Sequence, residues 1–232
     1  MNESVGFKQM AQMADQLTAK AGAGRRERKA EQTRRRILEA AQKQMALGGP
    51  ESITIQVVTE GADIGQGTFY NYFKSRDELV DAVIVDVVEN LGRRLDAMTQ
   101  GMSDAAEIYS FSLRHLMHTA VSDPVWGWFM VRLGIAQDGL LDALGPRASR
   151  DIQIGIDSGR FDIEDVKLAS AMTFGSLLAV MHDYLDTDRK EDPSSAYAES
   201  LLRMVGISPA EAKDIAHRPL PVLPELEASD LL

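Results

Sequence analysis

Cysteine is absent from the 232-residue sequence, which excludes disulfides, thiolate zinc sites and cysteine nucleophiles. Its absence is compatible with a reducing compartment. No apolar run approaches the roughly 20 residues that a membrane-spanning helix needs. The polar, mixed N-terminal segment lacks the apolar stretch of a signal peptide. We therefore expect the protein in the cytoplasm, with no membrane as a partner.

Charge is divided unevenly along the chain. The net charge of −10 by itself argues against nucleic acid as a partner. Residues 1–76, however, carry 12 Lys and Arg against 8 Asp and Glu, a balance of +4, so the remaining residues carry −14. This asymmetry favours a small basic head that faces DNA and a large acidic body that the duplex repels.

Apolar residues recur at helical spacing along the chain, with no hairpin signal and no internal repeat. We predict an all-α fold of about nine to ten helices. In this fold an N-terminal three-helix head precedes a C-terminal helical bundle. The expected divisions are a flexible arm over residues 1–24, the head over 25–76, the bundle over 77–218 and an extended tail over 219–232.

Capping residues and helix breakers predict where individual helices begin and end. Ser75 and Glu78 form a capping box at the start of a long helix that runs to Met98. The pair Gly145-Pro146 is expected to break the chain ahead of a new helix. Asp162 is a candidate N-cap for an apolar helix that follows it.

The segment from Ile53 to Glu78 carries the clearest functional signal. A short helical pattern, an interruption at Gly61-Ala62-Asp63 and a second short helical pattern are typical of a helix-turn-helix. The second piece begins with small and polar residues, Gly65-Gln66-Gly67-Thr68, so its backbone can approach a major groove closely. Gly67 serves either that approach or the packing of the helix.

The run Gly67-Thr68-Phe69-Tyr70-Asn71-Tyr72-Phe73-Lys74-Ser75 resembles the signature of the TetR family of bacterial transcriptional regulators. The resemblance is strong over residues 30–85 and elsewhere extends to helix order and length. One departure is Asp63, which stands at a turn position that is usually glycine. Aspartate tolerates the left-handed conformation better than most residues do. The resemblance implies a head that binds DNA and a body that dimerises and binds a small inducer.

The second short helix supplies the candidate base readers. Gln66 suits adenine, and the methyl group of Thr68 suits the methyl group of thymine. Asn71 either reads a base edge or faces solvent. A solvated helix start is the alternative for Gln66 and Thr68. Phe69 and Phe73 are expected in the core, where they bind this short helix to the first and fourth helices.

Other DNA contacts follow from the resemblance alone. The residues that match the family's phosphate ligands are Tyr70, Tyr72 and Lys74. Thr54 caps a helix whose N-terminus meets a phosphate. The family also sends a basic arm toward the minor groove, where arginine favours A·T-rich DNA; a solvated charged face is the alternative. The arm residues are Arg25, Arg26 and Arg28.

The apolar character of residues 168–181 supports a dimer. That helix is apolar nearly all round, so one face can pack on its own core and the other on a partner. With a matching stripe on the following helix, two subunits would form an isologous four-helix interface. A single deep monomeric core is the alternative. The predicted interface residues are Leu177, Leu178, Met181, Tyr197, Leu201, Leu202 and Val205.

Aromatic and methionine side chains near two histidines predict a ligand pocket in the body. An ordinary core explains the same residues, and the acidic body would also suit a cationic ligand. A metal site, formed when His182-Asp183 joins the two histidines, is a further alternative that requires converging geometry. The predicted pocket residues are Tyr109, Phe111, His115, His118, Trp126, Phe129, Met130 and Met172.

These patterns predict a dimeric repressor that a small molecule of unknown identity releases from a near-palindromic DNA operator. We expect no cofactor, no metal and no enzymatic activity. The sequence has no nucleophile–base spacing, no phosphate-binding glycine loop and no complete metal motif. An activator, a regulator controlled by a partner protein and a helical metal-dependent enzyme remain the alternatives.

Overall fold

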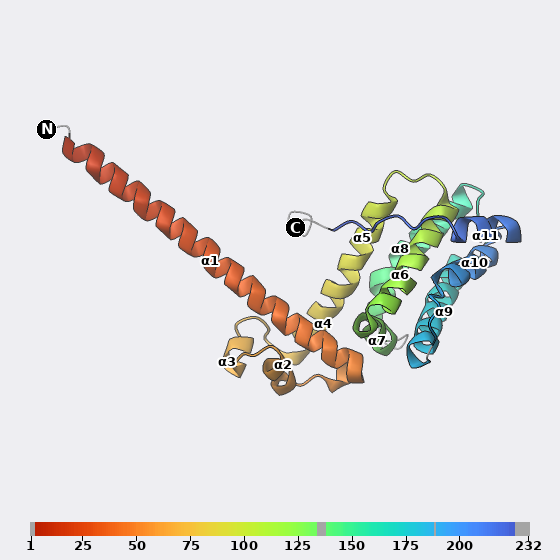
Figure 1. Ribbon diagram of the computed structural model, residues 1–232, viewed down its shortest axis with the longest axis horizontal. Coiled ribbons are helices and arrows are strands. Elements are labelled where there is room, and N and C mark those ends of the chain that lie inside the picture. Colours follow the sequence, from red (N-terminus) through yellow and green to blue (C-terminus); the bar gives the residue numbers. More distant parts are fainter. Residues whose placement is uncertain (1–2, 134–137, 188, 226–232) are drawn as a thin grey trace.

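The computed structural model describes residues 3–133, 138–187 and 189–225. Helices and turns make up these ranges, which contain no strand, so the predicted all-α class is confirmed (Figure 1). The helices are α1 (Glu3–Gly48), α2 (Ile55–Gly61), α3 (Gln66–Phe69), α4 (Arg76–Ile84), α5 (Asn90–Thr99), α6 (Ala105–Ser122), α7 (Pro124–Leu133), α8 (Asp138–Asp157), α9 (Val166–Asp186), α10 (Ser194–Met204) and α11 (Pro209–Ala216). A 3-10 turn, η1 (Pro50–Ser52), precedes α2, and a π-helical turn, η2 (Val85–Glu89), joins α4 to α5.

Helix α1 is much longer than the sequence pattern predicts. It runs unbroken from Glu3 to Gly48, so residues 3–24, for which a flexible arm is expected, are helical. Most of these residues are Ala, Gln, Lys, Met and Leu, which extend a helix readily once its other end is fixed. The second half of α1 provides that fixed end, because Ile37, Ala41 and Met45 are buried against the head. The first half projects away from every other element (Figure 1).

Two side-chain caps define the helices of the head. Thr54 Oγ1 accepts a hydrogen bond from the backbone N–H of Val57 at 3.2 Å, at the start of α2. Ser75 Oγ accepts one from the backbone N–H of Glu78 at 3.1 Å, at the start of α4. Each cap satisfies a backbone donor that the first turn of a helix leaves free. The predicted capping positions in the head are therefore confirmed.

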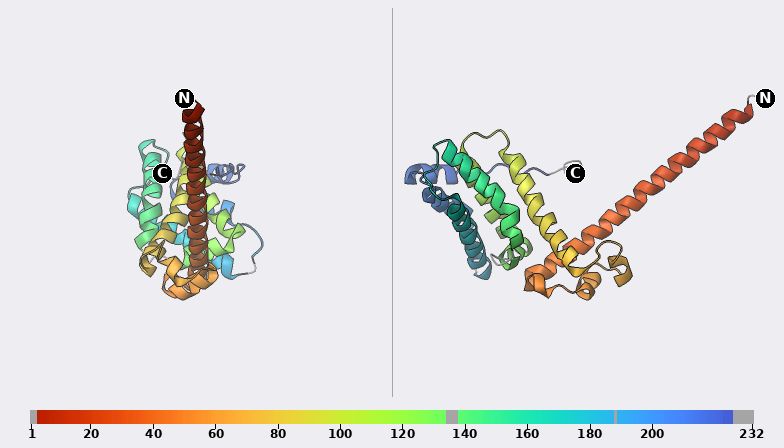
Figure 2. Two further views of the ribbon diagram at one scale, coloured as in Figure 1. Left: turned by 90° about the vertical axis from the view of Figure 1, so that its left-hand side faces the viewer. Right: turned by 180° about the vertical axis from the view of Figure 1, so that it is seen from behind.

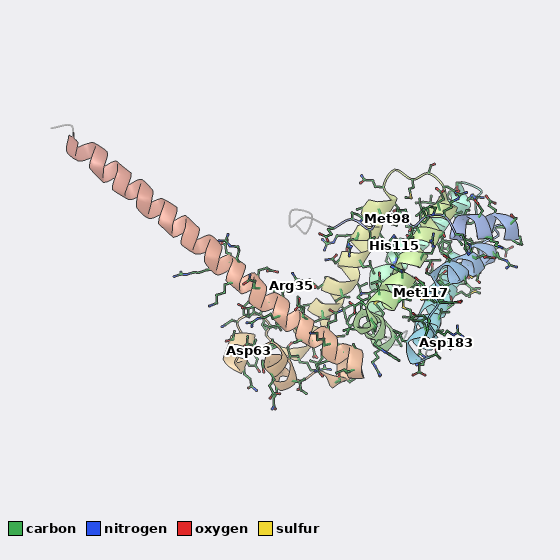
Figure 3. The ribbon with its side chains drawn as sticks, viewed as in Figure 1. Arg35, Asp63, Met98, His115, Met117 and Asp183 are labelled. Carbon is green, nitrogen blue, oxygen red and sulfur yellow. The ribbon has the colours of Figure 1, made fainter. Side chains whose placement is uncertain are left out.

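The turn between α2 and α3 places Asp63 in the left-handed region, with φ of 52°. Asp63 N–H donates to the Glu60 carbonyl at 3.2 Å, and the next N–H, of Ile64, donates to the Thr59 carbonyl at 3.0 Å. This backbone path reverses the chain within two residues, so that α3 packs across α2 (Figure 3). The exposed aspartate thus adopts the conformation that glycine would favour.

The body is assembled around α6, which α7, α8, α9, α10 and α11 all contact. Its buried residues include Ala106, Tyr109, Leu113 and Met117. Helix α7 packs on α1 and on α9, and so joins the head to the body (Figure 2). None of the helices in the described part of the chain has the length and apolar character needed to cross a membrane.

Two predicted helix boundaries in the body are wrong. Helix α8 continues through Pro146, which interrupts one backbone hydrogen bond without ending the helix. The N-cap of α9 is Asp165 instead of Asp162, because the Asp165 carboxylate accepts a hydrogen bond from Leu168 N–H at 3.0 Å. The first error follows from tertiary packing, which holds α8 across a weak local stop signal.

The segment after α11 forms a strap that crosses α6 toward α5 (Figure 1). Arg94 Nε donates to the Pro224 carbonyl at 2.8 Å, and His115 Nε2 donates to the Pro221 carbonyl at 2.8 Å. Burial lowers the pKa of His115, so the neutral imidazole is favoured in this position. The strap is thus held by side chains from two helices of the body.

Candidate nucleic-acid interface and internal cavity

The surface formed by α3 and the turn after it brings the predicted DNA-contacting residues together. Gln66, Asn71 and Lys74 are exposed, and Tyr70 is 56% exposed. Thr68 and Tyr72 are half-buried beside them, and the exposed Thr54 caps neighbouring α2. These seven residues are therefore all at least partly accessible to solvent.

Gly67 and Gly65 lie on the open side of α3. A Cβ atom placed on either residue would meet no atom within 4 Å. Close packing inside the protein therefore does not require glycine here, and the packing role considered for Gly67 is wrong. The missing side chains leave the α3 backbone bare toward solvent, where another molecule can approach it closely.

Two buried phenylalanines support this surface from below. Phe69 is fully buried, and its ring contacts those of Tyr70 and Phe73 at centroid distances of 5.4 and 5.8 Å. The Arg34 guanidinium of α1 lies 5.7 Å from the Phe73 ring centroid. The exposed polar residues are thus mounted on a rigid aromatic base, as the sequence predicts for Phe69 and Phe73.

Exposed basic side chains continue along α1 beyond α3. Arg26, Arg28, Arg35 and Arg36 are exposed. Among these four described side chains, Arg35 is the one that forms an ion pair, with Glu39. The backbone of Arg25 is helical, but its side chain lies outside the described set. The arginines predicted to form an arm therefore extend from a helix, which fixes their spacing.

The body encloses a separate cavity of about 50 Å³ between α5, α6, α8 and α9. Its wall is largely apolar, with a polar cluster at the side of α5 and α8. The lining residues are Leu95, Asp96, Thr99, Tyr109, Ser112, Leu113, Leu116, Arg147, Ala148, Asp151, Thr173 and Phe174. An apolar wall with a few convergent polar groups is typical of a small-molecule site.

The polar cluster of the cavity is a charge network. Arg147 Nε donates to Asp96 at 2.9 Å, and Arg150 bridges the same carboxylate to that of Asp151 with contacts of 2.7 Å. Burial raises the pKa of Asp151, although Arg150 donates to it. Across the cavity the buried Tyr109 hydroxyl lies 2.6 Å from Thr173 Oγ1. The site therefore offers both acceptors and donors around an apolar space.

Of the eight residues predicted for a ligand pocket, Tyr109 is the one that lines this cavity. Phe111, Trp126, Phe129 and Met130 are buried core residues outside its wall, and Met172 is 48% exposed. His115 and His118 face the strap side of α6, where His118 pairs with Asp192 at 2.7 Å. Helical periodicity marks these residues as apolar but does not decide which side of α6 or α7 faces a cavity.

The metal alternative is not supported by the described residues. His182 packs edge-to-face against Trp128, with centroids 5.6 Å apart, and Asp183 pairs with Arg189 at 3.1 Å. Figure 3 shows Asp183 on α9, well separated from His115. No group of three potential ligands in the described ranges is arranged to hold a metal ion.

Helix α9 has two distinct apolar faces, as its sequence predicts. One is buried in the body, whereas Leu168 is 58% exposed and Met172 is exposed on the opposite side. The predicted interface residues lie on the buried face of α9 or on α10, which packs on α6 and α11. All of them are buried within the single chain: Leu177, Leu178, Met181, Tyr197, Leu201, Leu202 and Val205.

Comparison with known proteins identifies the family to which this architecture belongs. Residues 37–83 match the family described as bacterial regulatory proteins, tetR family, and residues 104–218 match the tetracyclin repressor-like C-terminal domain. The chain is also 44% identical to RolR in its crystal structure with resorcinol. The match covers 85% of this chain and all of that one, with a TM-score of 0.67. The chain belongs to the TetR family. It is a DNA-binding transcriptional regulator.

Two further matches agree with this assignment. RolR without ligand is 43% identical, over 82% of this chain and 99% of that chain, with a TM-score of 0.66. A Bacillus subtilis protein described as the uncharacterized HTH-type transcriptional regulator YhgD is 33% identical over 60 residues. This chain covers only 31% of the length of YhgD, and 26% of this chain is matched.

The charged cavity residues of this TetR-family chain were missed at the sequence level. Glu89, Gly92 and Asp96 recur at intervals of three and four, so they share one face of the long helix. Two carboxylates and a glycine on one helix face are a signal that could have indicated a cationic partner packed against that face. The partner, Arg147, could not be assigned because it is distant in sequence and follows a proline expected to end the helix.

Proposed function

We propose that this protein is a dimeric repressor, held on a near-palindromic operator in the cytoplasm and released from it by a small phenolic molecule such as resorcinol. The observation that carries the proposal is that one chain combines an exposed α3 surface, supported by buried aromatic rings, with an internal cavity. RolR, whose crystal structure contains resorcinol, is its relative over the full RolR length.

The head has the chemistry to read DNA through α3. Gln66 and Thr68 are placed to meet base edges in the major groove, and bare Gly67 allows the backbone to approach. Tyr70, Tyr72 and Lys74 flank them as donors to phosphates, which position the duplex without specifying its sequence. Two heads related by a two-fold axis would read half-sites one helical turn or more apart.

The dimer that brings two heads together is proposed to form through the outer face of α9 and the adjoining face of α8. Leu168 and Met172 are exposed on α9, and Ile154 is exposed on α8, which packs beside it. An exposed apolar patch of this kind is typical of an interface. The two-fold axis would bring the same patch of both subunits into contact.

The cavity suits a small aromatic ring that carries hydroxyl groups. Leu113, Leu116 and Phe174 offer apolar walls for a ring. The carboxylates of Asp96 and Asp151 can accept hydrogen bonds from phenolic hydroxyls, and Arg147 can donate to them. The cavity wall does not offer a comparable set of contacts to a long or strongly anionic molecule.

The size of the cavity explains why binding would change the shape of the protein. Its 50 Å³ is well below the roughly 150 Å³ of an engineered cavity that holds benzene. A phenol can therefore enter only if α5, α6, α8 or α9 shifts. A ligand that binds only the shifted state moves the population toward it. Because α5 continues α4, that shift would reach the head.

Selection of random duplex DNA on the purified protein, at two salt concentrations, tests the DNA part of the proposal. We expect an enriched inverted repeat whose binding falls steeply with salt, because phosphate contacts release counterions. Resorcinol added to the selected complex should then release it. Binding without any sequence enrichment would contradict the proposal, as would an enriched repeat that resorcinol does not affect.

A further inference from the structure

Arg147 holds two turns of the long α4–α5 helix from across the body. Its NH2 and NH1 groups donate to the two carboxylate oxygens of Glu89 at 2.7 and 3.0 Å. Its Nε donates to Asp96 at 2.9 Å, two helical turns further along. These hydrogen bonds hold the pKa of Glu89 below its ordinary value and that of Arg147 above it. One guanidinium thus binds both carboxylates.

Gly92 makes this arrangement sterically possible. It lies between Glu89 and Asp96 on the same helix face, and a Cβ atom on it would lie 2.8 Å from Arg147 Cζ and 2.9 Å from Arg147 Nε. Any side chain at this position would push the guanidinium away. Glu89, Gly92 and Asp96 together form a seat for Arg147, which we call the arginine seat.

The arginine seat begins where the helix is irregular. The π-helical turn η2 spans Val85–Glu89, so Glu89 is both its last residue and a partner of Arg147. A π turn holds one residue more than an α turn, and each residue of an α-helix turns the chain by about 100° and advances it by 1.5 Å. A change of η2 to regular helix would therefore redirect α4 relative to α5.

The surroundings of η2 leave room for such a change. Val85 is 60% exposed. A groove of about 430 Å³ lies between η2 and α1, lined by Asp86, Val87 and Arg34 among others. The turn thus borders open space toward α1, and Arg147 ties its last residue to the body.

Helix α4 carries any change in η2 to the head. Arg76, in its first turn, donates to the carbonyls of Ile53 and Pro50 at 3.0 and 2.5 Å. Leu79 and Val83 of the same helix are fully buried. The head therefore moves with α4, whereas Arg147 and Asp96 line the cavity. The arginine seat lies between the two.

We propose that Arg147 transmits effector binding to the head: an effector hydroxyl in the cavity competes with Glu89 for the guanidinium, and the released η2 turn redirects α4. This inference rests on the proposed function, because it takes a cavity ligand and a DNA-binding head as given. It adds the residues that couple them. Arg147 is a coupling residue here and not a DNA contact.

The variants Glu89→Gln and Gly92→Ala test the coupling in the full-length dimer. The first removes the charge that pairs with Arg147, and the second displaces the guanidinium without changing any charge. Glu211→Gln is the matched control, since Glu211 also accepts a 2.7 Å hydrogen bond from an arginine, Arg160, away from the cavity. Operator affinity is measured by fluorescence anisotropy on the selected duplex, with and without resorcinol, and amide hydrogen exchange is followed across residues 84–92.

We expect both variants to bind the operator more weakly than wild type in the absence of resorcinol. Resorcinol should change their operator affinity about tenfold less than it changes that of wild type, which is within the usual range of allosteric coupling. Amide exchange across η2 should be faster in both variants. The Glu211→Gln control should match wild type in all three readouts.

The result that overturns the inference is specific to it. If resorcinol releases wild type, but Glu89→Gln and Gly92→Ala respond to it fully and exchange at the wild-type rate, Arg147 does not transmit the signal. If wild type itself does not respond to resorcinol, the proposed effector is wrong. The exchange rates then decide alone whether the arginine seat holds η2: unchanged rates in both variants reject it.

Discussion

At the scale of single residues, the head depends on side chains whose surroundings are unusual. Tyr70 is exposed although its ring packs edge-to-face against buried Phe69, so its hydroxyl is held at the surface in a fixed direction. Asp63 adopts a positive φ without a packing reason, since it is exposed. Both features make predictions that a single substitution can test.

Replacing Tyr70 with Phe should weaken operator binding about tenfold or more, because a hydrogen bond to a charged group contributes about 1.5–3 kcal/mol. The phenyl ring keeps its contact with Phe69, so the thermal unfolding midpoint should not change. Tyr184→Phe, on α9, is the matched control. Anisotropy and calorimetry measure the two quantities, and unchanged operator affinity in Tyr70→Phe would remove Tyr70 from the DNA contacts.

Replacing Asp63 with Ala should lower the free energy of unfolding by about 1 kcal/mol, because alanine lacks the local side-chain hydrogen bonding that helps aspartate adopt the left-handed conformation. Asp63→Asn should be close to neutral for the same reason. Urea unfolding of the three proteins gives the comparison. Equal stability of the alanine variant and wild type would show that the turn tolerates any residue.

At the scale of helices, the proposed dimer depends on the outer face of α9. Met172→Glu would place two carboxylates near the two-fold axis of the proposed dimer, where they are desolvated and repel each other. We expect this variant to sediment as a monomer. Val125→Glu, which changes an exposed apolar residue on α7, should remain dimeric. A dimeric Met172→Glu protein would place the interface elsewhere.

The strap on α6 predicts a pH dependence of stability. Burial lowers the pKa of His115 in the folded protein, below the value of about 6.5 in the unfolded chain. Below about pH 6.5 the unfolded chain therefore takes up a proton on this imidazole more readily than the folded protein does. The stability that the neutral imidazole provides is complete above about pH 7, and it is lost as the pH falls below about 6.5. This pH dependence of stability arises from the buried imidazole of His115.

In His115→Gln the amide can still donate to the Pro221 carbonyl, so stability at pH 8 should remain near that of wild type. Between pH 7 and pH 5, wild type should lose stability more steeply than the variant, by at most about 1.4 kcal/mol per pH unit. Urea unfolding at several pH values measures both slopes. Identical slopes would mean that His115 does not titrate differently in the folded protein.

What could be predicted from the sequence was what local chemistry determines. The caps Thr54 and Ser75 and the aromatic base of α3 depend on neighbours within a few residues, and they were found. The choice of which α9 face is buried depends on α6, α7 and α8, which are distant in sequence and pack against it. Sequence periodicity therefore showed two apolar faces of α9 but assigned to the interface the one that is buried within the chain.

At the scale of the whole molecule, a basic surface and an effector cavity are joined through one long helix. The head rests on α4, the cavity opens beside α5, and Arg147 of α8 contacts the helix near its irregular turn. Ligand-driven release from DNA then requires only that the cavity ligand and the operator favour different positions of this helix.

The most direct test is to titrate resorcinol calorimetrically into the free dimer and into the dimer saturated with its selected operator. Because coupling is reciprocal, resorcinol should bind the free dimer more tightly by the same factor by which it weakens operator binding, about tenfold or more. Equal affinity of resorcinol for the free and the operator-bound dimer would contradict the account, since a ligand without preference cannot release the DNA.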